Sequence, residues 1–235
     1  MTFPPLRRFD LFLLCSLLAL LPGACARSPK TTPQPVPEKP AAKSAPPPAR
    51  TNAPVGVGAL FDGQTLTGWA LTDFAGRGPV TVEQGQIKFG DGHMTGITWT
   101  NDLPRMNYEV SLDAQRVDGS DFFCGLTFPV GQEPCSFILG GWGGGVVGLS
   151  SINGEDASQN ETTSYMNFVK GRWYHVRVRV EPGKIQAWID GDRVVNLDTT
   201  DKKLGIRFEM EPSVPLGIAA WNTAAALKNI QIKKL

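Results

Sequence analysis

The stretch WYHVRVRVEPGKIQAWIDGDRVVNL, residues 173–197, decides the fold class. From Tyr174 to Val180, apolar and polar side chains alternate strictly, which is the period of a β-strand with one buried face. Pro182-Gly183 and Asp190-Gly191-Asp192 interrupt the alternation, and such sequences are typical of tight turns between strands. The stretch therefore predicts three consecutive antiparallel strands.

The same alternation recurs elsewhere in the chain, while helical periodicity is nearly absent. It covers residues 108–115 and the end of the chain, residues 225–232. Further strands are expected in apolar or glycine-rich segments near residues 122–128, 136–139 and 146–150. Many short strands without a long helix indicate an all-β fold, an antiparallel β-sandwich. The polar run at residues 153–164 predicts a long surface loop, and such loops are often functional.

The N-terminus resembles an export signal. Arg7 and Arg8 precede an apolar stretch, residues 11–21, that is too short to span a bilayer, which takes roughly 20 residues. The small residues before Cys25 suggest a lipoprotein signal peptide over residues 1–26, with lipidation at Cys25. Cleavage by an ordinary signal peptidase after Ala26 is the alternative. We prefer lipidation, although Pro22 departs from the usual lipoprotein pattern.

The rest of the chain divides into a linker and one domain. Residues 27–54 hold nine of the 19 prolines, so they predict an extended, disordered linker. Residues 55–235 suit a single domain with 16 Lys and Arg against 20 Asp and Glu. The net negative charge of this domain argues against nucleic-acid binding. We also expect the protein to be a monomer. The predicted location is the cell envelope, lipid-anchored to a periplasmic or outer surface, or alternatively secreted or soluble in the periplasm.

Two cysteines remain in the domain, Cys124 and Cys135, on a predicted hairpin. Because an exported protein meets an oxidising compartment, we expect a disulfide between them, with two buried thiols as the alternative. Only two histidines and no Cys-x-x-Cys are present, so no metal site and no cofactor are expected. Residues 118–121 carry oxygen ligands that could hold a divalent cation, but a plain hairpin turn is the preferred interpretation.

Two aromatic positions are candidates for sugar binding. The predicted hairpin turn at residues 182–183 places Arg177 opposite Trp188 on the polar face, in cation–π contact. Such a face could line a sugar groove or could simply be the solvated outer face of the sheet. Trp142 stands among five glycines, so its indole is poorly covered by its neighbours. It is either a sugar platform or a plug at one end of the sandwich.

The acids and histidines give a weaker signal. Glu109 and Asp113 share a strand face but lie four residues apart, roughly 13 Å, which is too far for a glycosidase carboxyl pair. His93 follows a predicted turn, and His175 shares the polar face with Arg177. Either histidine could transfer protons if it faces a groove, and a structural role is the alternative.

The motif LFDGQTLTGW at residues 60–69 resembles the opening signature of the 3-keto-disaccharide hydrolase domain family. Residues 108–113, the hairpin from Gly171 and the closing strands from Leu216 also resemble that family's segments. The resemblance implies a concanavalin A-like lectin/glucanase sandwich, a jelly roll. It places Leu60-Phe61 at the start of the first strand, Asp62-Gly63 in a turn and Trp69 at the start of the next strand.

The resemblance also implies a 3-ketosugar substrate. A C3 ketone acidifies the C2–H, so a base can remove that proton and the C1 substituent can leave. Asp113 stands in the acidic strand of the family and is the candidate base, with His175 or Arg177 as its electrophilic partner. The candidate catalytic residues are therefore Asp113 and His175. The candidate substrate-binding residues are Arg177, Trp188, Trp142, Glu109 and Trp221.

The chain departs from the family at two places that we expect to line the groove. It has Cys135-Ser136-Phe137-Ile138 where a Glu-x-Gln strand is common, and Trp221-Asn222-Thr223 where a His is common. The leading hypothesis is an exported glycoside hydrolase or lyase of the 3-ketosugar type. A non-catalytic glycan-binding module is the alternative, and a structural envelope protein is a third possibility.

Overall fold

The computed structural model describes residues 58–235 of the chain. The predicted signal peptide, residues 1–26 with Cys25, and the linker, residues 27–54, lie outside the described residues. Within residues 58–235, no helix is long and apolar enough to cross a membrane.

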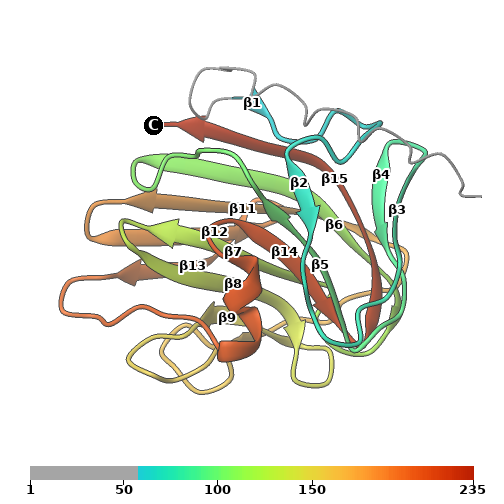
Figure 1. Cartoon of the computed structure of the whole chain (residues 1–235). Helices are drawn as coiled ribbons and strands as arrows, with labels where there is room; N and C mark the ends of the chain where they lie inside the picture. Colours follow the sequence, from blue (N-terminus) through green and yellow to red (C-terminus); the bar gives the residue numbers. More distant parts are fainter. Residues whose placement is uncertain (1–57) are drawn as a thin grey trace, which may run out of the picture. The chain divides into compact units, whose positions relative to one another are not determined.

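Two antiparallel sheets pack face to face, as predicted for a β-sandwich (Figure 1). The eight-stranded sheet has the order β13-β12-β11-β6-β15-β4-β3, with β1 also paired to β15. Its strands are β1 (Gly58–Ala59), β3 (Val80–Glu83), β4 (Gln86–Phe89), β6 (Tyr108–Gly119), β11 (Trp173–Glu181), β12 (Lys184–Ile189), β13 (Asp192–Asp198) and β15 (Thr223–Lys234).

The seven-stranded sheet has the order β10-β9-β8-β7-β14-β5-β2. Its strands are β2 (Trp69–Leu71), β5 (Met94–Trp99), β7 (Cys124–Val130), β8 (Glu133–Gly141), β9 (Val146–Ser150), β10 (Ser164–Tyr165) and β14 (Gly217–Trp221). The only helix within the described part of the chain is the 3₁₀-helix η1 (Phe208–Ser213). Figure 1 shows η1 in front of the seven-stranded sheet, and η1 contacts β5 and β14.

The alternation of residues 108–115 and 174–180 is confirmed. Val110, Leu112 and Ala114 of β6 are fully buried in the core between the sheets. Their polar neighbours therefore face away from the core, on the outer face of the eight-stranded sheet. The turn predicted at residues 190–192 is also confirmed, because β12 ends at Ile189 and β13 begins at Asp192.

The opening motif packs differently from its prediction. Leu60 and Phe61 are buried but lie after the first strand, β1, which ends at Ala59. Trp69 begins β2 as predicted and is buried, and its indole Nε1 donates a hydrogen bond of 2.7 Å to the Leu60 carbonyl. The first and last residues of the motif are therefore joined by a hydrogen bond at the edge of the core.

The predicted disulfide between Cys124 and Cys135 is wrong, since both cysteines are free. The hairpin of β7 and β8 sets Cys124 opposite Leu139, and Cys135 opposite Phe128. Four residues along a strand are about 13 Å, whereas bridged cysteines have Cα atoms within about 7 Å. Both side chains point into the core, where burial raises the pKa of each thiol to about 12. The alternative of two buried thiols is the one observed.

Candidate functional site

A cavity of about 240 Å³ opens on the outer face of the seven-stranded sheet, beside η1. Its apolar lining residues are Met94, Phe122, Ile138, Trp142, Met210 and Trp221. Its polar lining residues are Asp121, Ser136, Ser150, Arg207 and Glu209. Aromatic walls with a few polar groups are the usual composition of a small-ligand site.

The floor of the cavity comes from outward side chains of β8 and β9, among them Ser136, Ile138 and Ser150. Ser136 and Ile138 of β8 alternate with the core residues Cys135, Phe137 and Leu139, so they face outward. A Cβ at Gly125 of β7 would lie 3.0 Å from the Phe122 ring, so any larger residue would push this ring a few tenths of an ångström away from the sheet. Gly125 thus lets the Phe122 ring come close to the sheet.

Trp142 projects from the glycine-rich turn after β8 and is 41% exposed. Its φ is +49°, and among non-glycine residues of 58–235 with positive φ it alone is not Asn, Asp or Gln. A bulky residue in this conformation is unfavourable, and such strain is concentrated at functional sites. The Asp121 carboxylate accepts hydrogen bonds from the backbone N–H groups of Phe122 at 2.7 Å and Gly143 at 3.3 Å, which ties the turn to the cavity wall.

The Arg116 side chain also stabilises this turn. It is 5% exposed, and its terminal nitrogen donates to the carbonyls of Asp121, Gly140 and Gly144 at 3.0–3.1 Å. Burial lowers the pKa of Arg116, and the nearby Asp121 charge opposes this effect. The position of Trp142 at the cavity therefore depends on a buried guanidinium.

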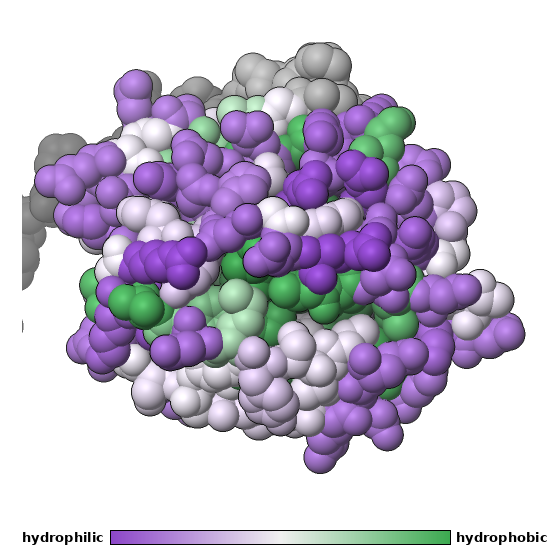
Figure 2. Space-filling model, turned by 180° about the vertical axis from the view of Figure 1, so that it is seen from behind, coloured by the Kyte–Doolittle hydropathy of each residue, from purple (hydrophilic) through white to green (hydrophobic). Residues whose placement is uncertain are grey.

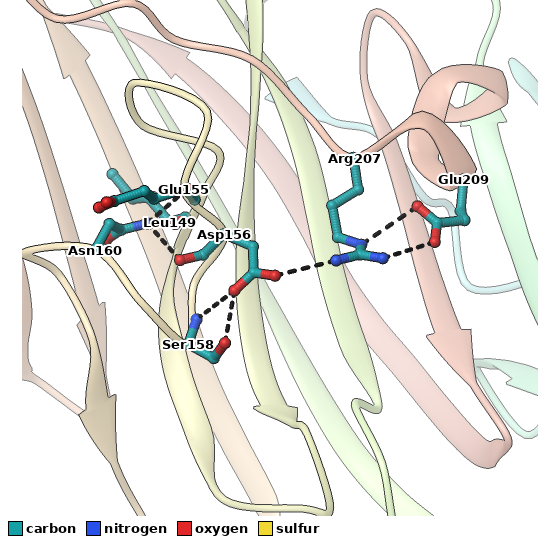
Figure 3. A network of polar contacts seen from close by, with 7 residues as sticks. All are labelled: Leu149, Glu155, Asp156, Ser158, Asn160, Arg207 and Glu209. Atoms are coloured by element: carbon teal, nitrogen blue, oxygen red, sulfur yellow. Dashed lines mark hydrogen bonds and ion pairs between the residues drawn. The ribbon is translucent and has the colours of Figure 1, made fainter.

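An ion-pair network crosses one side of the cavity (Figure 3). The guanidinium of Arg207 donates to Glu209 at 2.8 and 3.3 Å, and to Asp156 at 3.0 Å. Burial alone would raise the pKa of Glu209, but the hydrogen bonds and charge of Arg207 outweigh it and hold that pKa below its usual value. Glu209 is therefore an ionised carboxylate at neutral pH.

The long loop predicted at residues 153–164 forms the far end of this network. The Asn160 side-chain amide donates to the carbonyls of Leu149 at 2.7 Å, Glu155 at 3.1 Å and Asp156 at 2.8 Å (Figure 3). These bonds fasten the loop to β9. Asp156 is thereby held facing Arg207, and the loop and η1 are joined across the sheet face.

Two of the predicted site residues, Trp142 and Trp221, line the cavity. The ring of His93, the other histidine of the domain, packs on Trp221 with 4.3 Å between ring centroids. His93 is thus next to the cavity, although it is not part of its lining. The Ser136–Ile138 and Trp221 segments also lie at the cavity, where the groove was expected.

The other five predicted site residues lie on the outer face of the eight-stranded sheet. Asp113 and His175 come together there, with 2.8 Å between Oδ1 and Nδ1, and Asn229 donates to the other Asp113 oxygen at 2.7 Å. The predicted contact of Arg177 with Trp188 is confirmed, with the guanidinium 4.1 Å from the indole centroid. Figure 2, seen from the side opposite to Figure 1, shows a mainly hydrophilic surface crossed by a hydrophobic band.

Glu109 is the most buried acid of this face, with a side chain only 5% exposed. It pairs with Arg179 and Lys233, each at 2.9 Å, and with Arg177 at 3.4 Å. Burial would raise its pKa, but the hydrogen bonds of Lys233 and Arg179 lower it overall. Neither Glu109 nor Asp113 lines the cavity, so the structure separates the predicted residues between two opposite faces.

Sequence reasoning missed three polar residues of the cavity, Ser150, Arg207 and Glu209. Glu209 lies in η1, three residues before Pro212. The available signal was a non-periodic segment that mixes charges with Phe208 and Met210, which indicates a loop that packs on the domain. Within residues 58–235, no three His, Cys, Asp or Glu side chains converge as they would around a metal ion.

Comparisons with known proteins point to one family. The model of the 3-keto-alpha-glucoside-1,2-lyase-like domain matches residues 56–233, which is most of the chain. No curated protein matches the sequence.

Among solved structures, the chain is similar to a protein assigned as a glycosyl hydrolase from Parabacteroides distasonis, at 15% identity and a TM-score of 0.49, over 77% of this chain and 94% of that one. It is also similar to the carbohydrate binding module CBM66 from Bacillus subtilis, at 13% identity and a TM-score of 0.46, over 71% and 96% of the two chains. The Crh5 transglycosylase in complex with NAG is a third, at 13% identity and a TM-score of 0.48, over 77% and 86%. No substrate transfers from similarities this distant.

Proposed function

Because the chain belongs to the 3-keto-alpha-glucoside-1,2-lyase-like domain family, we propose that it binds a 3-keto-α-glucoside in the cavity of the seven-stranded sheet and cleaves its glycosidic bond. The observation that carries this proposal is the combination of Trp142 with an ionised carboxylate, Glu209, at one cavity. The indole offers an apolar face for the C–H groups of a sugar ring, and the carboxylate is a base.

The proposed reaction begins with proton abstraction. The C3 ketone acidifies the C2–H, and a Glu209 oxygen takes that proton while the electron pair forms an enolate with the ketone oxygen. The enolate re-forms the ketone, a C1–C2 double bond develops, and the C1–O bond breaks. The leaving oxygen takes a proton from water. The hydroxide left by that water adds to C1, and Glu209 returns its proton to C2, which gives the free 3-ketosugar and restores the carboxylate.

Arg207 is the proposed partner for the enolate. A guanidinium has five N–H donors, and three of those of Arg207 are used within the described residues, two by Glu209 and one by Asp156. Two donors therefore remain for a ligand, and a positive charge next to a developing oxyanion stabilises the transition state. The same pair keeps Glu209 ionised before substrate binds.

Product analysis tests this proposal. We expect the full-length protein to release glucose from 3-keto-trehalose, and the Arg207→Met variant to release it much more slowly. Detection of the enone intermediate by its ultraviolet absorbance would separate elimination from direct hydrolysis. Intact 3-keto-trehalose after long incubation with folded protein would overturn the enzymatic proposal.

A second candidate function is glycan binding without catalysis. It is favoured by the close pairing of Glu209 with Arg207, and by a cavity lining that contains no histidine where the family often has one. This function predicts that sugars bind at the cavity but are recovered unchanged. Calorimetry with the same 3-ketosugar and with its 3-hydroxyl parent distinguishes it from the first.

We further propose that the protein is exported and anchored by a lipid at Cys25, with the Pro-rich segment as a spacer from the membrane. The support is the sequence pattern before Cys25. Metabolic labelling with a fatty acid tests it, because the Cys25→Ser variant should lose the label. A protein that is exported but never labelled would indicate the ordinary signal-peptidase route instead.

A further inference from the structure

Ser150, the last residue of β9, holds a buried polar group that the fold leaves unused. It is 1% exposed and lines the cavity. Its hydroxyl has no hydrogen-bond partner among residues 58–235. Since a buried hydroxyl without a partner destabilises a protein, such a group at a cavity needs an explanation beyond folding.

The hydroxyls next to Ser150 in the sheet differ from it, because they do have hydrogen-bond partners. Ser150 lies opposite Ser136 of β8, and Ser136 lies opposite Thr127 of β7. The Ser136 and Thr127 hydroxyls are 2.8 Å apart and bond to each other. Two of the three hydroxyls in this row therefore bond to each other, and the third, that of Ser150 at the cavity, has no partner in the part of the chain that the structure describes.

The charges at the cavity limit the ligand class. Two carboxylates, Asp121 and Glu209, line it against a single guanidinium, Arg207, and that guanidinium is shared with a third carboxylate, Asp156. An anionic sugar would meet net repulsion here. The cavity of about 240 Å³ is also smaller than the roughly 300–1,000 Å³ of pockets for drug-sized ligands. A single neutral sugar ring fits both limits.

We propose that Ser150 is a specificity-determining residue, whose hydroxyl binds one hydroxyl group of a neutral sugar ring in this cavity and so excludes sugars that lack it. The inference rests on the proposed function and names the substrate class of the same site. A serine hydroxyl donates one hydrogen bond and accepts two, as a sugar hydroxyl does, so the two groups can pair in either direction. A site built around such a bond discriminates strongly against the deoxy analogue.

The Ser150→Ala variant separates this role from a structural one. A structural hydroxyl would lower the melting temperature on removal, whereas removal of an unpaired hydroxyl leaves the melting temperature unchanged or raises it. Ser213→Ala is the matched control, because Ser213 of η1 is also buried and its hydroxyl is also unpartnered within the described residues. Ser213 does not line the cavity, so its variant should behave as wild type toward sugars.

The probes are methyl 3-keto-α-glucoside, its 2-, 4- and 6-deoxy analogues, and the corresponding 3-keto-glucuronide, tested on the full-length protein. For the wild type, we expect one deoxy analogue to lose about 10- to 100-fold in kcat/KM. Ser150→Ala should lose a similar factor on the parent glucoside and lose nothing more on that analogue. The glucuronide should be a poor substrate for all three proteins.

Three outcomes would overturn the inference: a Ser150→Ala variant with wild-type kcat/KM on every probe, one with a lowered melting temperature, or a wild type that prefers the glucuronide. If the wild type cleaves none of the probes, the proposed enzymatic function fails separately. Calorimetry with the same probes then decides, because loss of affinity for one neutral sugar in Ser150→Ala still supports the inference. Absence of any binding by the wild type overturns both.

Discussion

The outer faces of the two sheets satisfy their polar groups in opposite ways. On the eight-stranded sheet, Glu109 lies among three cations, Asp113 bonds to His175 and Asn229, and Arg177 stacks on Trp188. On the seven-stranded sheet, Ser150 is buried without a partner among residues 58–235, and Trp142 is exposed on a strained backbone. A face whose groups satisfy one another is a stable surface, whereas unsatisfied groups and strain indicate a binding site.

The difference follows from where the long connections run. The segment between β9 and β10 and the segment between β13 and β14 both fold over the seven-stranded sheet, and Arg207 with Asp156 joins them. Strands β11, β12 and β13 of the eight-stranded sheet are joined by two-residue turns, which are too short to fold over its outer face. Within residues 58–235, the long connections therefore form a hollow on one face, whereas the short turns of β11, β12 and β13 form none on the other.

The largest expected difference between the two faces is in catalysis, and it concerns the two candidate bases, Glu209 and Asp113. Glu209→Gln keeps the shape of the side chain but removes its basicity, so we expect kcat/KM for methyl 3-keto-α-glucoside to fall by about 10²- to 10⁴-fold. Asp113→Asn, on the opposite face, should leave kcat/KM unchanged. Steady-state kinetics of the two variants, with circular dichroism to confirm folding, makes the measurement. The reverse result would transfer catalysis to the eight-stranded sheet, as the sequence alone suggested.

A smaller effect is expected for the two tryptophans. Trp142→Ala removes an exposed indole at the cavity, and we expect about 10-fold weaker binding of methyl 3-keto-α-glucoside. Trp188→Ala removes the indole beneath Arg177 and should leave binding unchanged. Isothermal titration calorimetry on both variants checks this. Equal losses would mean that the sugar contacts both faces, which one bound molecule cannot do.

The sequence predicted the fold well because strand periodicity and turn chemistry are local. The turn at Pro182-Gly183 alone sets the register of β11 and β12, and from it follows the contact of Arg177 with Trp188. Alternation at residues 225–232 predicted the closing strand, observed as β15, and the family signature added the segment from Leu216, which contains β14. Among the predicted strands, the error concerned Leu60 and Phe61, whose burial gives the same apolar signal whether or not they pair in a sheet. Strands β3, β4, β5 and β10 were not predicted.

The site was harder to predict because its residues come from segments with no period. Alternation shows which side chains share a face, but it does not show which face is hollow. Arg207 and Asp156 are 51 residues apart in the chain, and only the folded loops bring them together. The disulfide prediction failed for a related reason. The hairpin turn fixes the register of β7 and β8 so that Cys135 pairs with Phe128, four residues along β7 from Cys124.

The third prediction tests whether the eight-stranded face serves stability. Glu109→Gln leaves Arg177, Arg179 and Lys233 without their shared carboxylate, so we expect a loss of about 1–3 kcal/mol in the free energy of unfolding. Catalysis should be unchanged. Denaturant unfolding and kinetics measure both. The exposed pair of Glu83 with Lys88 supplies a control, since Glu83→Gln should be neutral.

Acid titration sharpens the same test. The pKa of Glu109 is lower in the folded protein than its ordinary value of 4.5, so its contribution to stability is present above that pH and is lost as the pH falls through the folded pKa. Wild-type stability should therefore fall more steeply below about pH 4.5 than that of Glu109→Gln. Parallel curves for the two proteins would show that Glu109 does not stabilise the face.

The smallest expected effect concerns the core between the two faces. Because burial raises the pKa of Cys124 and Cys135 to about 12, we expect neither thiol to be alkylated in the native protein, and reducing agents should leave the melting temperature unchanged. Peptide mass spectrometry after alkylation, with and without denaturant, resolves the two positions. A disulfide-linked peptide would require β7 and β8 to slip by four residues, which would separate Ser136 from Thr127 and remodel the cavity floor. The redox state of the core therefore tests the register on which the candidate site depends.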